Sequence, residues 1–218
     1  MGSIHLPIVV AVVIAYVAGS IPSAYLAGRW HGVDIRQHGS GNLGATNVVR
    51  VLGIRIGALV FIVDTIKGFL PVFFLPALTG TAHPEIVSLT VGAAAILGHV
   101  RPIFLLGQKG GKGVATAGGV FLGVAWLPAV IAFAVWILVF ATSRYVSVAS
   151  LSAAFALPLA FLVTGRSISD PFFIASIVVA AFVFFTHRAN IGRLRRGEEH
   201  RFTKGRAGAP ESQPPRVA

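Results

Sequence analysis

The sequence predicts an all-α membrane protein, a polytopic bundle of helices. Of its 218 residues, 55% are hydrophobic and only 11% are charged, whereas soluble domains carry about 25% charged residues. The apolar residues form runs long enough to cross a bilayer as helices. The 18 Lys and Arg residues, against 7 Asp and Glu, lie mainly between these runs and in the tail. We therefore expect no nucleic-acid partner, although the chain is strongly basic.

The first predicted crossing comprises residues 6–27, an apolar run that begins without the cationic stretch of a signal peptide. A second crossing is predicted at 56–78 and a third at 86–99. The connection between them contains Gly80 and Pro84, which favour a turn. We expect the second and third crossings to form a helical hairpin.

Three more apolar segments follow, at 114–141, 146–163 and 171–186. The first contains Pro128, which cannot continue a helix. We expect it to form two short helices, hinged there, that enter the membrane and return to the same side. The predicted architecture is five long crossings plus two short half-membrane helices, seven helices in all. Three ordinary crossings with an outside tail are the alternative.

The Lys and Arg residues of the connections predict the orientation, because cationic loops stay on the cytoplasmic side. Residues 29–55, 101–112 and the chain from 188 onward are basic, whereas the connection at 79–84 has neither Lys nor Arg. We therefore expect the N-terminus outside and the C-terminus inside.

The chain is expected to contain one domain and a tail. We assign residues 1–199 to a single transmembrane domain. Residues 200–218 are basic, contain Gly, Pro, Ser and Gln, and have little that is apolar, so a disordered cytoplasmic tail is predicted.

The first basic connection contains a glycine-rich stretch that favours an anion site. Glycines permit the positive-φ geometry in which backbone N–H groups converge on an anion. Arg50 adds a planar fork that pairs with phosphate or carboxylate. A solvated polar loop is the alternative. The other residues of this stretch expected at the site are Ser40, Gly41, Asn42, Thr46 and Asn47.

The second basic connection contains Gly-Gly-Lys-Gly, residues 110–113, directly before an apolar run. It differs from a P-loop, because Gly113 rather than Ser or Thr follows Lys112. Glycines around a lysine at a helix start still expose N–H groups at the positive end of the helix dipole, where phosphate is stabilised. A cationic boundary of a membrane helix is the alternative. The residues of this connection predicted to bind phosphate are His99, Lys109, Gly110, Gly111, Lys112, Gly113 and Thr116.

A third basic stretch follows the last apolar segment. If it is helical, His187 and Asn190 share one face, and both can donate hydrogen bonds to phosphate. For Arg195, Arg196 and the residues beyond 200, contact with anionic lipid head groups is the simpler interpretation.

Asp64 and Lys67 lie inside an apolar run, where charged groups are costly unless they are paired or face a cavity. Their three-residue spacing favours a structural ion pair over direct catalysis.

Several kinds of chemistry are excluded or disfavoured. The chain has no cysteine, which excludes disulfides, thiolate metal sites and cysteine nucleophiles. Its seven histidines are scattered singly, and no metal site is expected. Ser40 is not in a Gly-x-Ser-x-Gly nucleophile elbow. The polar stretches are therefore suited to holding one or two phosphates.

Three motifs follow one another along the chain. They are Ser-Gly-Asn-x-Gly-Ala-x-Asn-x-x-Arg at 40–50, Gly-Gly-Lys-Gly-Val-Ala-Thr at 110–116 and His-x-x-Asn-Ile-x-Arg-Leu-x-x-Gly-x-Glu at 187–199. With Gly-Ser-Ile-Pro at 19–22 and Asp64 with Lys67, they resemble the bacterial acyl-phosphate:glycerol-3-phosphate 1-acyltransferase family over residues 19–199. The sequence departs from that family at Gln108, where an aromatic residue is usual.

The resemblance implies transfer of a fatty acyl group from acyl phosphate to the 1-hydroxyl of sn-glycerol 3-phosphate. The products are lysophosphatidic acid and phosphate, in the first acylation of phospholipid synthesis, and no cofactor is needed. It implies a bacterial inner-membrane protein, with its active site facing the cytoplasm and a functional link to an enzyme that produces acyl phosphate. We expect a monomer. The implied catalytic residues are Ser40, Arg50, Lys112, His187 and Asn190, and Asp64, Lys67, Arg193 and Glu199 are expected to be structural.

Two other classes of protein compete with this interpretation. A transporter of a phosphate ester would place its polar residues at the bilayer midplane, between pseudo-symmetric halves. A non-enzymatic phospholipid-binding scaffold would account for the basic tail but not for three motifs rich in glycine.

Overall fold

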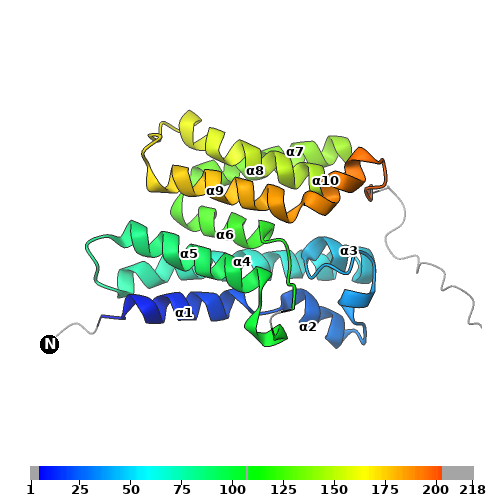
Figure 1. The fold of residues 1–218 in the computed structure, drawn as a ribbon, viewed down its shortest axis with the longest axis horizontal. Coiled ribbons are helices and arrows are strands. Elements are labelled where there is room, and N and C mark those ends of the chain that lie inside the picture. The colour runs from blue at the N-terminus through cyan, green and yellow to red at the C-terminus, as the bar shows by residue number, and fades with distance from the viewer. Residues whose placement is uncertain (1–4, 107, 203–218) are drawn as a thin grey trace, which may run out of the picture.

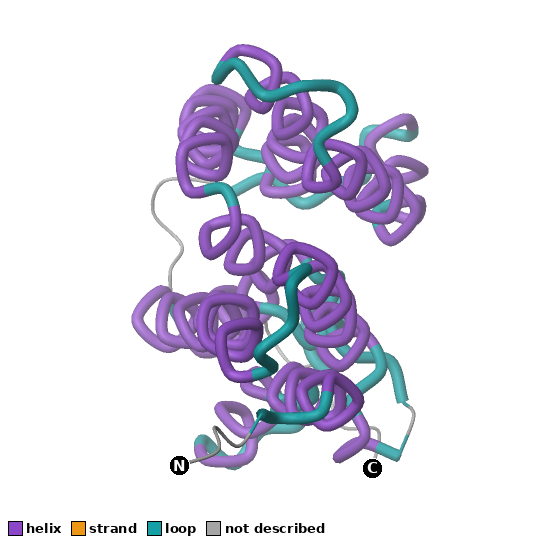
Figure 2. Tube along the Cα trace, turned by 90° about the vertical axis from the view of Figure 1, so that its left-hand side faces the viewer, coloured by secondary structure: helices purple, strands orange, loops and turns teal. Residues whose placement is uncertain are grey.

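The computed structural model describes residues 5–106 and 108–202, and every regular element in these ranges is helical (Figures 1 and 2). The prediction of an all-α bundle is confirmed. Five of the described helices or broken helices are long and apolar enough to cross a membrane, and a further helix, α9, ends where the chain bends by 57° into α10. The helices are α1 (Ile8–Gly19), α2 (Ser23–Trp30), α3 (Ala45–Leu52), α4 (Ile54–Leu78), α5 (Pro84–Val100), α6 (Val114–Val124), α7 (Trp126–Ser143), α8 (Val146–Val163), α9 (Pro171–Thr186) and α10 (Arg188–Arg195), with short 3-10 helices at Ile35–Gln37 and Ile103–Leu105.

The first predicted crossing is a broken helix. α1 ends at Gly19 and α2 begins at Ser23, and Pro22 lies in the interruption. Proline lacks the backbone N–H group that a helix interior needs. The two helices together still form one apolar span of 23 residues. Beside it, α4 and α5 form the predicted hairpin (Figure 1).

Two groups of helices build the bundle: α1–α5 form the first and α7–α10 form the second. The helix α6 lies between them (Figures 1 and 2). It packs on α4 and α5 of the first group and on α7 and α9 of the second. A Cβ atom on Gly68 would lie 2.1 Å from the carbonyl oxygen of Thr116, and one on Gly119 would lie 2.0 Å from that of Thr65. Such small residues let two membrane helices meet backbone to backbone. They fix α6 closely against α4.

The segment after residue 113 does return to the side from which it starts, as predicted. The backbone N–H of Phe202, beyond α10, donates to the carbonyl of Arg144 at the end of α7 (3.0 Å). The prediction of two short helices is wrong for α7, which has 18 residues and is long enough to cross. The helix breaks at Ala125, so Pro128 is the third residue of α7. Proline is tolerated in a first turn, because the N–H groups there have no partner within the helix.

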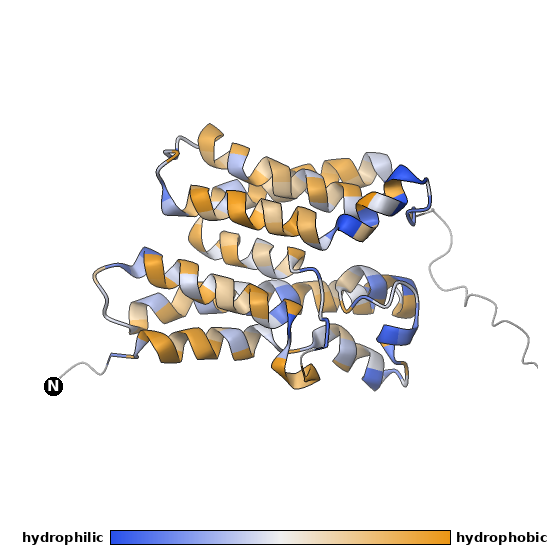
Figure 3. Cartoon of the chain, in the orientation of Figure 1, coloured by the Kyte–Doolittle hydropathy of each residue, from blue (hydrophilic) through white to orange (hydrophobic). Residues whose placement is uncertain are grey.

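Polar residues gather at one end of the bundle. Figure 3 shows hydrophilic residues concentrated around α10, the connection before α3 and the end of α2, with apolar residues along the long helices. Of the predicted tail, the described residues 200–202 pack at this end, and residues 203–218 lie outside the described part of the chain. The three basic motifs are thus brought to the same end.

A buried polar cluster ties the first crossing to α4 and α5. The predicted ion pair is present: Lys67 Nζ lies 2.8 Å from Asp64 Oδ1, and both side chains are buried. Lys67 also donates to the carbonyl of Ile21 (2.8 Å). The hydroxyl of Ser23 donates to Asp64 (2.5 Å), and His99 Nδ1 lies 3.6 Å from the same carboxylate oxygen. Asp64 and Lys67 therefore hold the helix break in place.

Candidate active site

The connection between α2 and α3 folds around the amide of Asn47. Its Nδ2 donates to the carbonyls of Ile35 (3.2 Å) and His38 (3.0 Å). Its Oδ1 accepts from the backbone N–H of Ser40 (2.8 Å). Gly39 has a φ of 58°, and a Cβ there would lie 2.4 Å from Asn47 Oδ1. Asn47 was predicted to bind phosphate, but its amide shapes the loop that presents Ser40.

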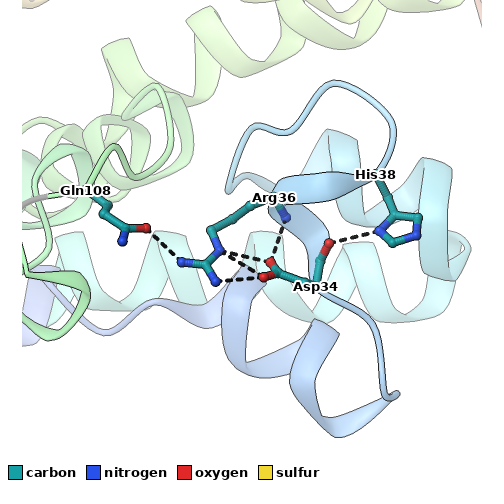
Figure 4. A network of polar contacts seen from close by, with 4 residues as sticks. All are labelled: Asp34, Arg36, His38 and Gln108. Atoms are coloured by element: carbon teal, nitrogen blue, oxygen red, sulfur yellow. Dashed lines mark hydrogen bonds and ion pairs between the residues drawn. The ribbon is translucent and has the colours of Figure 1, made fainter.

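A polar bridge that the sequence interpretation missed joins this loop to the one before α6 (Figure 4). The guanidinium of Arg36 pairs with Asp34 (2.6 Å) and donates through Nη1 to Gln108 Oε1 (2.7 Å). It also lies over the ring of Tyr25, 4.9 Å from the ring centroid. Hydrogen bonding from Arg36 lowers the pKa of Asp34 to about 2. The sequence signal that could have revealed this bridge was Gln108, where the chain departs from the family motif.

The backbone N–H groups of two glycines before α6 are not free for phosphate. Gly110 donates to the carbonyl of Val100 (2.9 Å), and Gly111 donates to that of His99 (3.3 Å). Both positions lack room for a side chain, because a Cβ on Gly110 would lie 2.0 Å from His99 O and one on Gly111 would lie 2.1 Å from His99 Nε2. The predicted donor role of Gly110 and Gly111 is therefore wrong. Because both residues are glycines, the loop can pack closely against the buried side chain of His99.

The other residues predicted near this loop differ in accessibility. Gly113, with a φ of 83°, is the N-cap of α6. Thr116 is fully buried, and its hydroxyl has no hydrogen-bond partner among the described residues. Lys109 is exposed. In the first motif, Ser40 is exposed, and Gly41, Asn42 and Thr46 are half-buried.

Side chains from the second and third motifs form one chain of hydrogen bonds. Lys112 Nζ donates to Asn190 Oδ1 (2.5 Å), and Asn190 Nδ2 donates to Glu199 Oε1 (2.6 Å). Arg193 Nε donates to the other oxygen of Glu199 (2.7 Å). Although burial raises it, the pKa of Glu199 lies below its usual range because Asn190 and Arg193 donate to the carboxylate. Glu199 therefore orients both donors as an ionised group.

Arg50, from the first motif, completes a cationic cluster with Lys112 and Arg193. Its guanidinium lies over the ring of Phe202, 5.5 Å from the centroid, and its buried Nε has no hydrogen-bond partner in the described chain. Burial and the charges of Arg193 and Arg50 lower the pKa of Lys112 to about 8, against the opposing effect of Glu199. Three cations here share one carboxylate, so a bound anion would relieve both their repulsion and their desolvation.

The Nε2 atom of His187 is a hydrogen-bond acceptor rather than a donor. Nδ1 lies 2.8 Å from the carbonyl of Val183, and a carbonyl can only accept, so Nδ1 carries the hydrogen. Burial, and then the charge of Lys112, lowers the pKa of His187 to about 4. The ring is neutral at pH 7, and Nε2 presents a lone pair. The prediction that His187 donates to phosphate therefore gives way to a role as acceptor.

An apolar cavity of about 230 Å³ begins next to this cluster. Val114, two residues after Lys112, and Val183, the partner of His187, both line it. It continues between α4, α6, α7, α8 and α9. The large side chains that line it are Phe61, Phe121, Leu122, Phe133, Trp136 and Leu157.

The fold and this site define an integral membrane protein with a cationic cluster and an apolar cavity side by side at one end of a helical bundle. A family model described as glycerol-3-phosphate acyltransferase matches residues 9–197. The chain belongs to the glycerol-3-phosphate acyltransferase family.

Individual relatives agree with this membership. The chain is 49% identical to a glycerol-3-phosphate acyltransferase of Geobacter sulfurreducens, over 87% of this chain and 94% of the relative. It is 44% identical to that of Aquifex aeolicus, over 88% and 97%. Among solved structures it is similar to PlsY, an integral membrane glycerol 3-phosphate acyltransferase, in its glycerol 3-phosphate form. The TM-score is 0.79 and the identity 41%, over 90% of this chain and 96% of that one. The lysophosphatidic acid form of PlsY gives a TM-score of 0.77.

Proposed function

We propose that this protein transfers a fatty acyl group from acyl phosphate to the 1-hydroxyl of glycerol 3-phosphate. The products are lysophosphatidic acid and phosphate. The observation that carries the proposal is the cluster of Arg50, Lys112 and Arg193 around one carboxylate, Glu199, at the start of an apolar cavity. The cations suit the phosphates of the substrates, and the cavity suits the acyl chain.

The reaction is a direct displacement at the acyl carbon. The substrate hydroxyl oxygen forms the new ester bond, and the bond between the acyl carbon and the phosphate oxygen breaks. His187 Nε2 accepts a hydrogen bond from the hydroxyl and orients it. Since the pKa of His187 is about 4, its imidazole does not retain the hydroxyl proton, and the proton passes to an oxygen of the departing phosphate. Acyl phosphate is a mixed anhydride with a good leaving group, so positioning and charge stabilisation suffice without a cofactor or metal.

The remaining site residues hold the reactants. Arg50 presents its planar fork to one phosphate, and Lys112 adds a point charge. Asn190 and Arg193 are oriented by Glu199, and Ser40 lies on the adjacent loop. We place the protein as a monomer in the bacterial inner membrane. Its site faces the cytoplasm, because the basic connections lie at the end of the bundle that holds the site. An enzyme that makes acyl phosphate supplies the donor.

The decisive experiment follows phosphate release by the purified protein in detergent or a lipid mesophase. Hexadecanoyl phosphate and glycerol 3-phosphate are mixed with it, and hexadecanoyl-coenzyme A serves as a parallel donor. Release that depends on both substrates, without reaction of the thioester, is expected. Reaction with the thioester alone would contradict the donor assignment. Inactivity of folded protein with both donors would favour the transporter.

The pH dependence of catalysis should follow the charge of Lys112. Its pKa is about 8, so the ammonium binds phosphate below pH 8 and loses its charge as the pH rises through that value. We expect kcat/KM to fall above pH 8. In Lys112→Arg the fall should move to higher pH, because a guanidinium stays protonated. Profiles of phosphate release, corrected for spontaneous hydrolysis, measure this. If kcat/KM fell over the same alkaline pH range in both proteins, the assignment of this fall to Lys112 would be contradicted.

The length of the acyl chain should be limited by the apolar cavity. Gly118 lines the cavity, and a Cβ there would meet no atom within 4 Å. Gly118→Leu should therefore fill the cavity without disturbing the fold. We expect kcat/KM for hexadecanoyl phosphate to fall about tenfold more than that for octanoyl phosphate, given the usual effect of methylene-sized changes in apolar pockets. Gly118→Ala is the control, and an equal loss for both donors would place the acyl chain elsewhere.

A further inference from the structure

Phe202 joins three parts of the chain that are distant in sequence. Its backbone N–H donates to the carbonyl of Arg144 (3.0 Å). Its ring meets that of Phe140 edge to face, with centroids 5.8 Å apart, and the guanidinium of Arg50 lies over it at 5.5 Å. The preceding residue, Arg201, lies over the ring of Tyr145 at 5.8 Å. These contacts attach the segment after α10 to the turn between α7 and α8.

The side chain of Arg50 has few described contacts besides this ring. Its Nε is buried and has no hydrogen-bond partner in the described chain. Glu199 attracts its charge, whereas Arg193 and Lys112 repel it. Within the described chain, the aromatic face of Phe202 is therefore the side-chain contact that holds the guanidinium in place.

We propose that Phe202 is a positioning residue for substrate phosphate: its ring holds the guanidinium of Arg50 in the position from which it binds. A cation–π contact with the ring uses no hydrogen-bond donor of the guanidinium, so its N–H groups remain available for bidentate pairing with phosphate. This inference rests on the proposed function of Arg50. Phe202 also lies beyond residue 197, where the family match ends, so this support comes from outside the matched region.

The test compares three substitutions at Phe202 and its neighbour in the full chain. Phe202→Leu keeps an apolar contact with Phe140 but removes the aromatic face, and Phe202→Tyr keeps the face. We expect Phe202→Leu to raise the KM of one of the two phosphate-bearing substrates by about threefold to tenfold, with kcat within about twofold. Phe202→Tyr should have the wild-type KM. Arg201→Ala, which alters the same segment away from Arg50, should also leave KM unchanged.

Two further measurements separate positioning from folding and from the proposed function. The melting temperature of Phe202→Leu in detergent should match that of the wild type, and a rise in KM without loss of stability supports the proposal. Equal KM values in the wild type and Phe202→Leu, or equal impairment of Phe202→Leu and Phe202→Tyr, would overturn it. If the wild type itself transfers no acyl group, the proposed function fails. Calorimetric titration with glycerol 3-phosphate and with inorganic phosphate then tests Phe202 by the same comparison of Kd values.

Discussion

Lys112→Ala is expected to lower kcat/KM for acyl transfer by at least about 100-fold. Lys112 is the only side chain of the glycine-rich loop seen to join the cationic cluster in the described structure, where it contacts Asn190. Loss of one charged group that faces developing negative charge typically costs two to three orders of magnitude in rate. Phosphate release measures the loss, and Arg50→Ala should have an effect of similar size.

Lys109→Ala is the matched control for Lys112→Ala. Lys109 belongs to the same loop but is exposed, and its loss should leave kcat/KM within about twofold, as is usual for surface substitutions. The melting temperature and elution volume of both variants in detergent should match those of the wild type. Most activity surviving in folded Lys112→Ala would remove Lys112 from the site.

Asp64→Ala is expected to destabilise the protein by about 3–5 kcal/mol, the usual cost of leaving one partner of a buried ion pair unpaired. Among the described residues, the ammonium of Lys67 would then keep only its hydrogen bond to the carbonyl of Ile21. Ser23 and His99 would lose the same carboxylate. Reversible unfolding in mixed micelles measures the change in the free energy of unfolding.

The double variant Asp64→Leu with Lys67→Met distinguishes an unpaired charge from a general loss of packing. Both charges are then absent, and replacement of a buried pair by apolar residues is often close to neutral. We expect the double variant to be more stable than Asp64→Ala, although Ser23 still loses its acceptor. A double variant as unstable as the single one would show that packing, rather than charge, determines the loss.

The helices were largely predictable, because runs of apolar residues and the distribution of Lys and Arg report directly on membrane segments. The error at α7 has a local cause. Whether Pro128 breaks or begins a helix depends on where that helix starts, and the break at Ala125 has no strong sequence signal. The interrupted first crossing is a similar case. Pro22 alone does not show that the helix breaks there, because the break also depends on the polar partners of Ile21 and Ser23, which lie far away in sequence.

The candidate site was predictable in its residue types and only partly in their roles. Arg50, Lys112 and Asn190 do lie together, because their motifs form loops and short helices at one end of the bundle. The sequence could not show that the N–H groups of Gly110 and Gly111 are already paired, since this depends on how α5 ends. The contact between Phe202 and Arg50 joins opposite ends of the chain, and no local pattern predicts it.

The apolar cavity has a consequence for how the donor reaches the enzyme. Phe61, Leu122 and Phe133 line it and are also exposed on the flank of the bundle, by 37%, 38% and 47%. A groove bordered by such residues is open sideways to the acyl chains of the bilayer. The donor can enter the cavity laterally from the leaflet, so that its acyl chain stays in an apolar environment throughout. If the donor is the proposed acyl phosphate, turnover is governed by its mole fraction in the membrane rather than by its concentration in bulk water.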